Sequence, residues 1–74
     1  MALINQMVQE NKSRYNIHKK TECNYYILVE SGEKYLQLDT FGSNDREIAG
    51  KVSQSIQFSP DAIKQLKKIL DREF

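Results

Sequence analysis

Apolar and polar side chains alternate along residues 24–41, a pattern typical of β-strands. The segments NYYILVE and KYLQLDTF are rich in β-branched and aromatic residues, and the polar sequence SGEK separates them. If residues 31–34 form a four-residue loop, Glu30 lies opposite Tyr35 in an antiparallel hairpin. The apolar face of this hairpin comprises Ile27, Val29, Leu36 and Leu38. The opposite face comprises Tyr26, Leu28, Glu30, Tyr35, Gln37 and Asp39. The alternation therefore predicts a hairpin with one face in the core and one face outside.

The last third of the chain predicts one more strand and then a helix. Residues 51–58 alternate again. Val52, Gln54, Ile56 and Phe58 share one face, and Lys51, Ser53, Ser55 and Gln57 share the other. Ser59 suits a helix N-cap, Pro60 suits the first helical position, and Asp61 favours the positive end of the helix dipole. The predicted apolar stripe of the helix is Ile63, Leu66, Ile69, Leu70 and Phe74.

The N-terminal third is less regular. Residues 2–11 carry apolar side chains at a spacing that suits a short amphipathic helix, but no cap precedes them, so a frayed arm is the alternative. Residues 13–18 alternate Tyr15 and Ile17 with polar residues and predict a short strand. We expect an N-terminal helix or arm over residues 1–12 and one sheet-plus-helix domain over residues 13–74. The expected fold class is α+β, with an antiparallel sheet of about four strands packed on one long C-terminal helix.

Chain length limits how stable such a domain can be. With 74 residues, the chain forms one domain that buries only about 60% of its unfolded surface. A single core of this size contributes a stability margin of roughly 3–5 kcal/mol. Cys23 is the single cysteine, so neither an internal disulfide nor a cysteine zinc site can reinforce the fold. We therefore expect a homodimer.

Targeting signals and charge narrow the functional class. The N-terminal residues lack the basic start, apolar run and cleavage site of a signal peptide, and no stretch approaches the roughly 18 apolar residues of a membrane span. Together with the lone cysteine, these features predict a cytoplasmic protein with no membrane partner. The net charge is +1, so the chain lacks the strongly basic character of a non-specific duplex binder. Basic residues gather in residues 11–20 and 64–72, and solvated faces would explain both clusters.

The sequence contains no recognisable catalytic or metal-binding constellation. His18 and Cys23 do not have the spacing of a zinc site, and a sheet this small hardly makes a cleft in which they could converge. The carboxylates are scattered, and the glycine-bounded loop 42–50 does not form a phosphate-binding motif. We expect neither enzyme activity nor a cofactor.

The polar face of the predicted sheet is the candidate binding site. Tyrosines can stack on bases, amides and hydroxyls can bond base edges, and basic residues can hold phosphates. Tyrosine is also enriched at protein interfaces, so a protein partner is an alternative, and an unremarkable wet sheet surface is a third. We expect single-stranded nucleic acid, with DNA favoured, as the ligand. The candidate binding residues are Arg14, Tyr26, Tyr35, Gln37, Arg46, Lys51, Ser53, Gln54 and Gln57.

Gln54 is unusual because the alternation places its amide on the core-facing side. A buried amide must find hydrogen-bond partners. Three explanations are open: the strand bulges near Gln54, its side chain bonds the loop 42–50, or it lies at a dimer seam. The polar face of the sheet could also dock a protein. The alternative function is therefore that of a small inhibitor or accessory subunit.

The segment SQSIQFSPDAIKQLKKIL, residues 53–70, resembles the transcriptional coactivator family of positive cofactor four. Members of that family end in a polar or basic strand, a Ser-Pro-acidic corner and a helix with a Gln-Leu-Lys core. The matching residues here are Gly50, Lys51, Ile56, Phe58, Ser59, Pro60, Asp61, Gln65, Leu66 and Lys67. The resemblance implies a homodimer that grips single-stranded or melted DNA with its strands and dimerises through its helices. It also implies that Lys51, Ser53 and Gln54 contact DNA, although the family is usually more basic at these positions.

Overall fold

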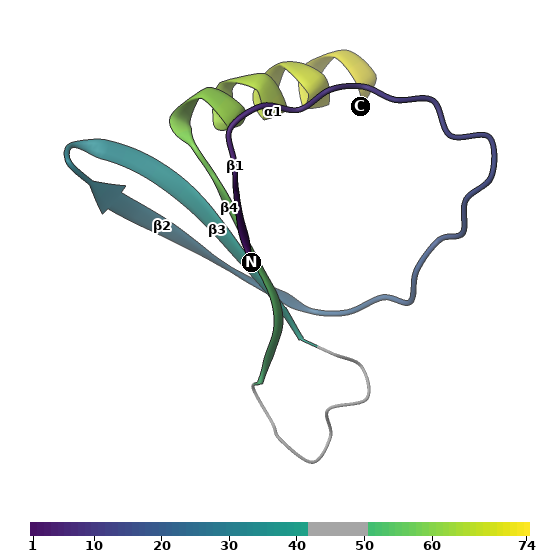
Figure 1. The fold of residues 1–74 in the computed structure, drawn as a ribbon, viewed down its shortest axis with the longest axis horizontal. Helices are drawn as coiled ribbons and strands as arrows, with labels where there is room; N and C mark the ends of the chain where they lie inside the picture. The colour runs from purple at the N-terminus through teal and green to yellow at the C-terminus, as the bar shows by residue number, and fades with distance from the viewer. Residues whose placement is uncertain (42–50) are drawn as a thin grey trace.

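A computed structural model describes residues 1–41 and 51–74 of the chain, which form a four-stranded sheet and one helix (Figure 1). The elements are β1 (Ala2–Ile4), β2 (Cys23–Glu30), β3 (Glu33–Phe41), β4 (Val52–Phe58) and α1 (Pro60–Glu73). The strand order is β1-β4-β3-β2. Neighbouring strands β2, β3 and β4 are antiparallel, whereas β1 runs parallel to β4. The predicted α+β class is confirmed, with a mixed rather than purely antiparallel sheet.

The β2–β3 hairpin keeps its predicted faces but not its predicted register. Glu30 pairs with Glu33, so the loop has two residues instead of four. Ser31 and Gly32 both have positive φ angles, 52° and 77°, as in a type I′ turn, whose twist matches that of the flanking strands. The pairing therefore differs from the prediction by two residues. A shift of two leaves every side chain on its predicted face, since side chains alternate with a period of two.

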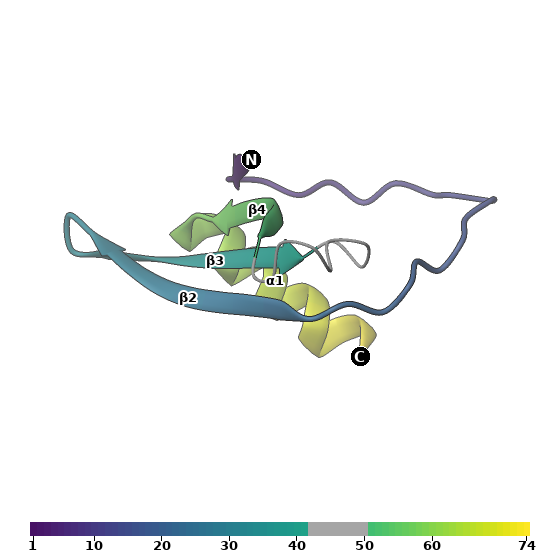
Figure 2. The ribbon, with the colours of Figure 1, turned by 90° about the horizontal axis from the view of Figure 1, so that it is seen from below.

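The N-terminal segment contains neither the helix that was one of the two alternatives for residues 1–12 nor the strand predicted at residues 13–18. No helix is present in residues 2–11; residues 2–4 instead form β1, in which Ile4 pairs with Phe58. Residues 13–18 form no strand. Between β1 and β2 the chain runs in an extended path away from the sheet, without regular secondary structure (Figures 1 and 2). The strand prediction at 13–18 was wrong because short local alternation does not by itself supply a neighbouring strand to pair with.

The helix begins as its sequence predicts. Ser59 is the N-cap, and its Oγ accepts a hydrogen bond from the backbone N–H of Ala62 at 3.2 Å. Pro60 occupies the first turn and Asp61 supplies its acidic residue. Phe74, predicted in the apolar stripe, is instead the C-cap residue and is 96% exposed. The stripe thus ends before the last residue.

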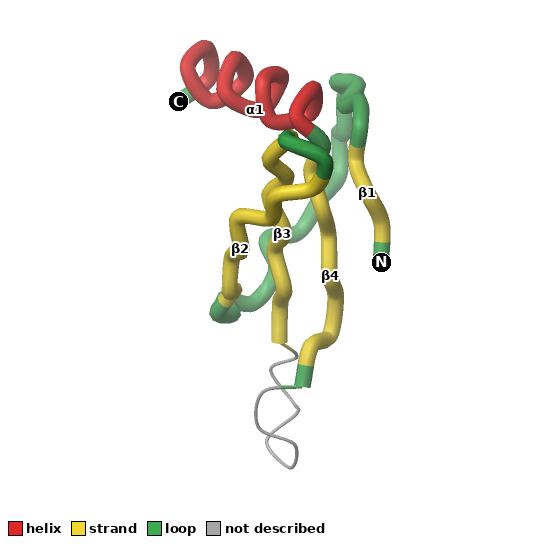
Figure 3. Tube along the Cα trace, turned by 90° about the vertical axis from the view of Figure 1, so that its left-hand side faces the viewer, coloured by secondary structure: helices red, strands yellow, loops and turns green. Residues whose placement is uncertain are grey.

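The best-buried part of the molecule is the corner where β4 turns into α1 (Figure 3). Phe58 and Ala62 are its buried apolar residues, and α1 packs against β3 and β4. Ser59 Oγ also donates to Asn5 Oδ1 at 2.7 Å, and the Ser59 N–H donates to the Ile4 carbonyl oxygen at 2.9 Å. These bonds attach the end of β1 to the corner.

The shape is open for a chain of this length. The radius of gyration is 14.6 Å, whereas a compact 74-residue domain would have one of about 11 Å. In the parts of the chain that the structure describes, no helix has the length and apolar character needed to cross a membrane.

Candidate nucleic-acid interface

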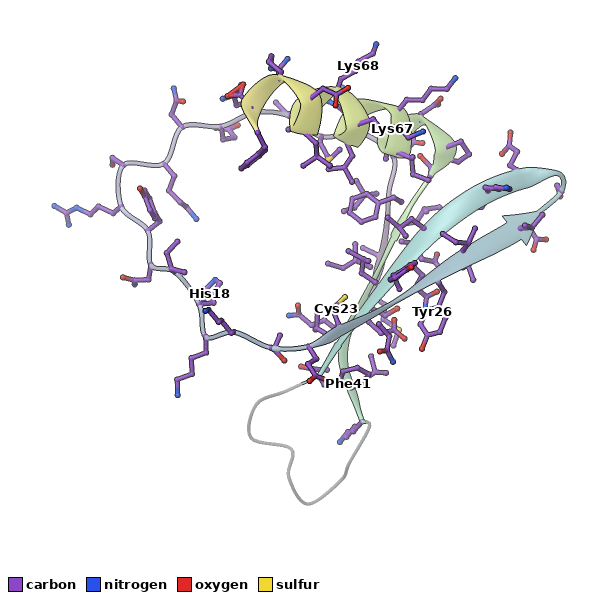
Figure 4. All side chains as sticks on the ribbon, turned by 180° about the vertical axis from the view of Figure 1, so that it is seen from behind. His18, Cys23, Tyr26, Phe41, Lys67 and Lys68 are labelled. Atoms are coloured by element: carbon purple, nitrogen blue, oxygen red, sulfur yellow. The ribbon has the colours of Figure 1, made fainter. Side chains whose placement is uncertain are left out.

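The candidate site is the side of the sheet that faces away from α1, which we call the polar face. Pairing brings Tyr26 opposite Gln37, and Gln37 opposite Gln57, so that β2, β3 and β4 each contribute one residue to a row. Side chains of neighbouring residues alternate across the sheet, and Figure 4 shows Cys23 directed to the helix side and Tyr26 directed away from it. The strand residues of the polar face are Leu3, Asn24, Tyr26, Leu28, Glu30, Glu33, Tyr35, Gln37, Asp39, Phe41, Val52, Ser55 and Gln57.

The amides of this row are hydrogen-bonded to each other. Gln57 Nε2 donates to Gln37 Oε1 at 2.9 Å, and Gln37 Nε2 donates to Asp39 Oδ1 at 3.0 Å. Asp39 is only 7% exposed, so the chain of bonds ends on a buried carboxylate. Each amide has two N–H donors and a carbonyl with two lone pairs. The one hydrogen bond that each amide nitrogen donates therefore orients the side chain. Its second N–H group and the remaining carbonyl lone pairs are left for a ligand.

The two tyrosines of the polar face differ in accessibility. Tyr26 is 42% exposed and its hydroxyl bonds none of the residues that the structure describes, which favours it as a stacking platform. Tyr35 is half-buried, pairs with Leu28, and its hydroxyl donates to Glu33 Oε2 at 3.5 Å. Tyr26 is thus the stronger stacking candidate of the pair.

A β-bulge changes the start of β4. Thr40 pairs with Gln54 but Phe41 pairs with Val52, so Ser53 is the extra residue. Of the three explanations for Gln54, the bulge beside it is the one that the structure shows. Gln54 lies on the same face as Ile56 and Phe58, as predicted, but it is exposed rather than buried. Val52 does not keep its predicted place on the core face, because the bulge brings it opposite Phe41.

The predicted phosphate-binding residues are not gathered on the polar face. Arg14 lies in the extended segment between β1 and β2, exposed and away from the strands. Lys51 is exposed directly before β4, and Arg46 lies outside the described residues. In the described strands, the polar face carries the carboxylates of Glu30, Glu33 and Asp39 and no basic side chain.

Basic side chains do lie near one end of this face. Lys19 and Lys20 shortly precede β2, and Lys51 precedes β4. Because β2 and β4 both run antiparallel to β3, the starts of both strands lie at the end of the sheet where β3 finishes. Glu30 and Glu33 lie at the opposite end, beside the turn. Glu22 directly precedes β2 at this same end, so both signs of charge lie there, whereas Glu30 and Glu33 make the turn end of the face negative.

A second set of contacts, for which the sequence contains no signal, joins the N-terminal segment to α1. Met7 N–H donates to Gln65 Oε1 at 2.8 Å, and Gln65 Nε2 donates to the Met7 carbonyl oxygen. A hollow of about 350 Å³ lies beside this pair. Its lining comprises Met7, Val8, Gln9, Gln65, Lys68, Ile69, Arg72 and Glu73. The lining includes no serine, threonine, cysteine or histidine, and no cluster of three or more metal-ligating side chains occurs among residues 1–41 and 51–74.

Comparison of the chain with family models, curated proteins and solved structures found no match.

Proposed function

We propose that this chain is a non-catalytic binding protein whose ligand is single-stranded nucleic acid, with DNA favoured over RNA, held across the polar face. The observation that supports this most is the row formed by Tyr26, Gln37 and Gln57, in which an accessible aromatic ring lies beside two amides that are already oriented. Oriented groups lose less conformational freedom on binding, so more of the interaction energy contributes to affinity.

Each part of the row has a role in this proposal. Tyr26 stacks on a base, which is worth about 1–3 kcal/mol and tolerates any base. Gln37 and Gln57 bond the polar edges of neighbouring bases with the donor and acceptor capacity that their mutual bonds leave free. Lys51 pairs with a phosphate at the end of the sheet, where Lys19 and Lys20 add positive charge.

The resemblance to the coactivator family adds a biological context to the proposal. A chain of this kind would act in the cytoplasm as a homodimer that binds melted DNA and regulates transcription. The match at Ser59, Pro60 and Asp61 corresponds to the corner that anchors α1 to the sheet.

A protein partner is the second candidate, and the charge of the polar face favours it. Glu30, Glu33 and Asp39 repel phosphates, whereas tyrosine, glutamine and leucine side chains suit a protein surface. In that case the chain would be an inhibitor or accessory subunit that docks by the same face.

Fluorescence anisotropy of labelled oligonucleotides about 20 nucleotides long separates these candidates. We expect binding that weakens as salt rises, with a slope of about −0.7 per neutralised phosphate, and a loss of roughly 5- to 150-fold in Tyr26→Ala. Tyr15→Ala is the matched control, because Tyr15 is 69% exposed but lies in the extended segment. Absence of binding at low salt, or equal losses in the two variants, would overturn the proposal. Absence of binding would also direct attention to a protein partner.

A further inference from the structure

Strand β2 is an apolar strand at the edge of the sheet. Within residues 1–41 and 51–74, it pairs with β3 on one side and has no strand on the other. Tyr25, Ile27 and Val29 project to the same side of the sheet as the half-buried Leu36 and Leu38, yet they are 71%, 60% and 65% exposed. The helix packs mainly against β3 and β4, and Figure 1 shows β2 running apart from it.

This edge lacks the features that usually prevent strands from pairing between molecules. Natural edge strands are protected by charged side chains, prolines, bulges or short length. Residues 23–29 contain no charge, no proline and no glycine, and β2 pairs regularly with β3 over its whole length. The bulge of this sheet lies in β4 instead.

The chain exposes more surface than a compact monomer of its mass, both in the extended segment between β1 and β2 and along β2. A compact monomer of 8.7 kDa exposes about 4,700 Å², whereas this chain exposes 7060 Å². The difference exceeds the ~800 Å² that one partner buries in an interface of standard size. The chain thus exposes more surface than one standard interface would bury.

The backbone of β2 is correctly oriented to pair with a copy of itself. In a hairpin closed by a two-residue turn, the pair beside the turn is hydrogen-bonded and the pairs alternate from there. The N–H and C=O groups of Tyr25, Ile27 and Val29 therefore point away from β3. An antiparallel pair centred on Ile27 places Tyr25 opposite Val29 of the second copy, and Asn24 opposite Glu30 of the second copy. No like charges meet, and both apolar faces lie on the same side of the joined sheet.

We propose that two copies of this chain associate through β2, in antiparallel register about Ile27, to form one continuous eight-stranded sheet. The pairing satisfies the outward backbone groups of both edges and places Tyr25, Ile27 and Val29 of each copy beside their counterparts. This interface differs from the helix-mediated dimer that the family resemblance implies.

The pairing also extends the proposed function, and this one consequence rests on that function. Because both copies keep the same orientation across the joined sheet, their polar faces form one surface. The two Tyr26 side chains then lie near the seam, so a single nucleic-acid strand can contact both.

Light scattering coupled to size-exclusion chromatography tests the interface with the full chain. We expect the wild type to have a mass of about 17 kDa, twice the 8.7 kDa of one chain, and Ile27→Lys to have that of one chain. Ile17→Lys is the matched control, because Ile17 is 88% exposed in the extended segment, and it should leave the dimer intact. A monomeric wild type, or a dimeric Ile27→Lys, would overturn the proposal; the latter would indicate the helix-mediated dimer.

Cross-linking gives a second test that does not depend on how well Ile27→Lys folds. In a Cys23→Ser background, Ile27→Cys places two thiols beside each other on the symmetry axis, about 5.5 Å apart at Cα, which suits a disulfide. We expect mild oxidation to yield a covalent dimer that reducing agent reverses, and little dimer from Ile17→Cys in the same background. Equal cross-linking of the two variants would contradict the register.

The oligonucleotide titration distinguishes this inference from the proposed function. If the chain is a monomer and binds DNA with the expected salt slope, the β2 interface is ruled out and the proposed function is retained. If the chain dimerises through β2 but does not bind DNA, the proposed function is ruled out and the β2 interface is retained.

Discussion

Phe58 in β4 is 9% exposed and Ile27 in β2 is 60% exposed, although both are large apolar residues on the same face of one sheet. β4 lies between β1 and β3 and runs directly into α1, so the helix covers its end. β2 lies at the sheet edge, beyond the helix. The alternating pattern determines which way a side chain points, whereas the order of the strands determines whether anything covers it.

The two regions also differ in their polar contacts. At the corner, Ser59 bonds Asn5, Ala62 and the backbone of Ile4, which links three elements through one residue. Along β2, the side-chain hydrogen bonds that the structure records are confined to Cys23, which donates to the neighbouring Asn24 carbonyl. We infer that the corner provides the stability of one chain, while β2 provides surface for association.

The largest effect is expected from a substitution that disrupts the corner between β4 and α1. Phe58→Ala removes most of the buried apolar volume, and such substitutions cost about 3–5 kcal/mol. Because this equals the whole stability margin expected for a domain of this size, we expect the variant to lose its cooperative unfolding transition. Urea unfolding followed by circular dichroism measures this. Phe74→Ala, at a residue that is 96% exposed, should unfold like the wild type. A cooperative transition near the wild-type midpoint in Phe58→Ala would show that the corner is not the core.

A smaller effect should follow from the loss of the helix cap. Ser59→Ala removes the acceptor for the Ala62 N–H and the donor to Asn5, and we expect the unfolding free energy to fall by about 1–2 kcal/mol. Ser53→Ala is the control, since Ser53 is exposed at the bulge and its side chain bonds no residue in the described part of the chain. If the two variants were equally stable, the link between β1, β4 and α1 would contribute little.

The smallest effect concerns β2 and depends on protein concentration. Val29 is 65% exposed in one chain, so Val29→Ala should change the unfolding free energy of the monomer by less than about 0.5 kcal/mol. If β2 pairs between copies, each dimer contains the substitution twice, so the loss of stability per dimer is doubled. The difference in thermal midpoint between the variant and the wild type then grows as protein concentration rises. Thermal unfolding over a roughly hundredfold concentration range measures this. A difference that stays constant with concentration would place Val29 outside any interface.

Local features were the ones that could be predicted. The start of α1 follows from Ser59, Pro60 and Asp61, because capping and the helix dipole act over one turn. The faces of the hairpin follow from alternation, since side chains on one strand alternate with a fixed period. The register did not follow, because it depends on Ser31 adopting a positive φ, which is uncommon for any residue other than glycine.

Long-range features were missed. β1 contains three residues and forms only because Ala2–Ile4 pairs with residues 56–58, at the other end of the sequence. The Gln65 amide bonds the Met7 backbone, and nothing near either residue indicates this contact. Part of the candidate site was predictable: Tyr26, Tyr35, Gln37 and Gln57 were placed on one face, while Arg14 was wrongly assigned to a strand beside them.

By itself the sequence determined the α+β class, the direction of each strand side chain and the residue at which the helix begins, because these depend on neighbours along the chain. Only the tertiary structure decided that Phe58 is covered while Ile27 is exposed, that Asp39 is buried at the end of an amide chain, and that β2 forms the edge of the sheet. These features depend on which strands pair, and pairing is decided by contacts between residues far apart in the sequence.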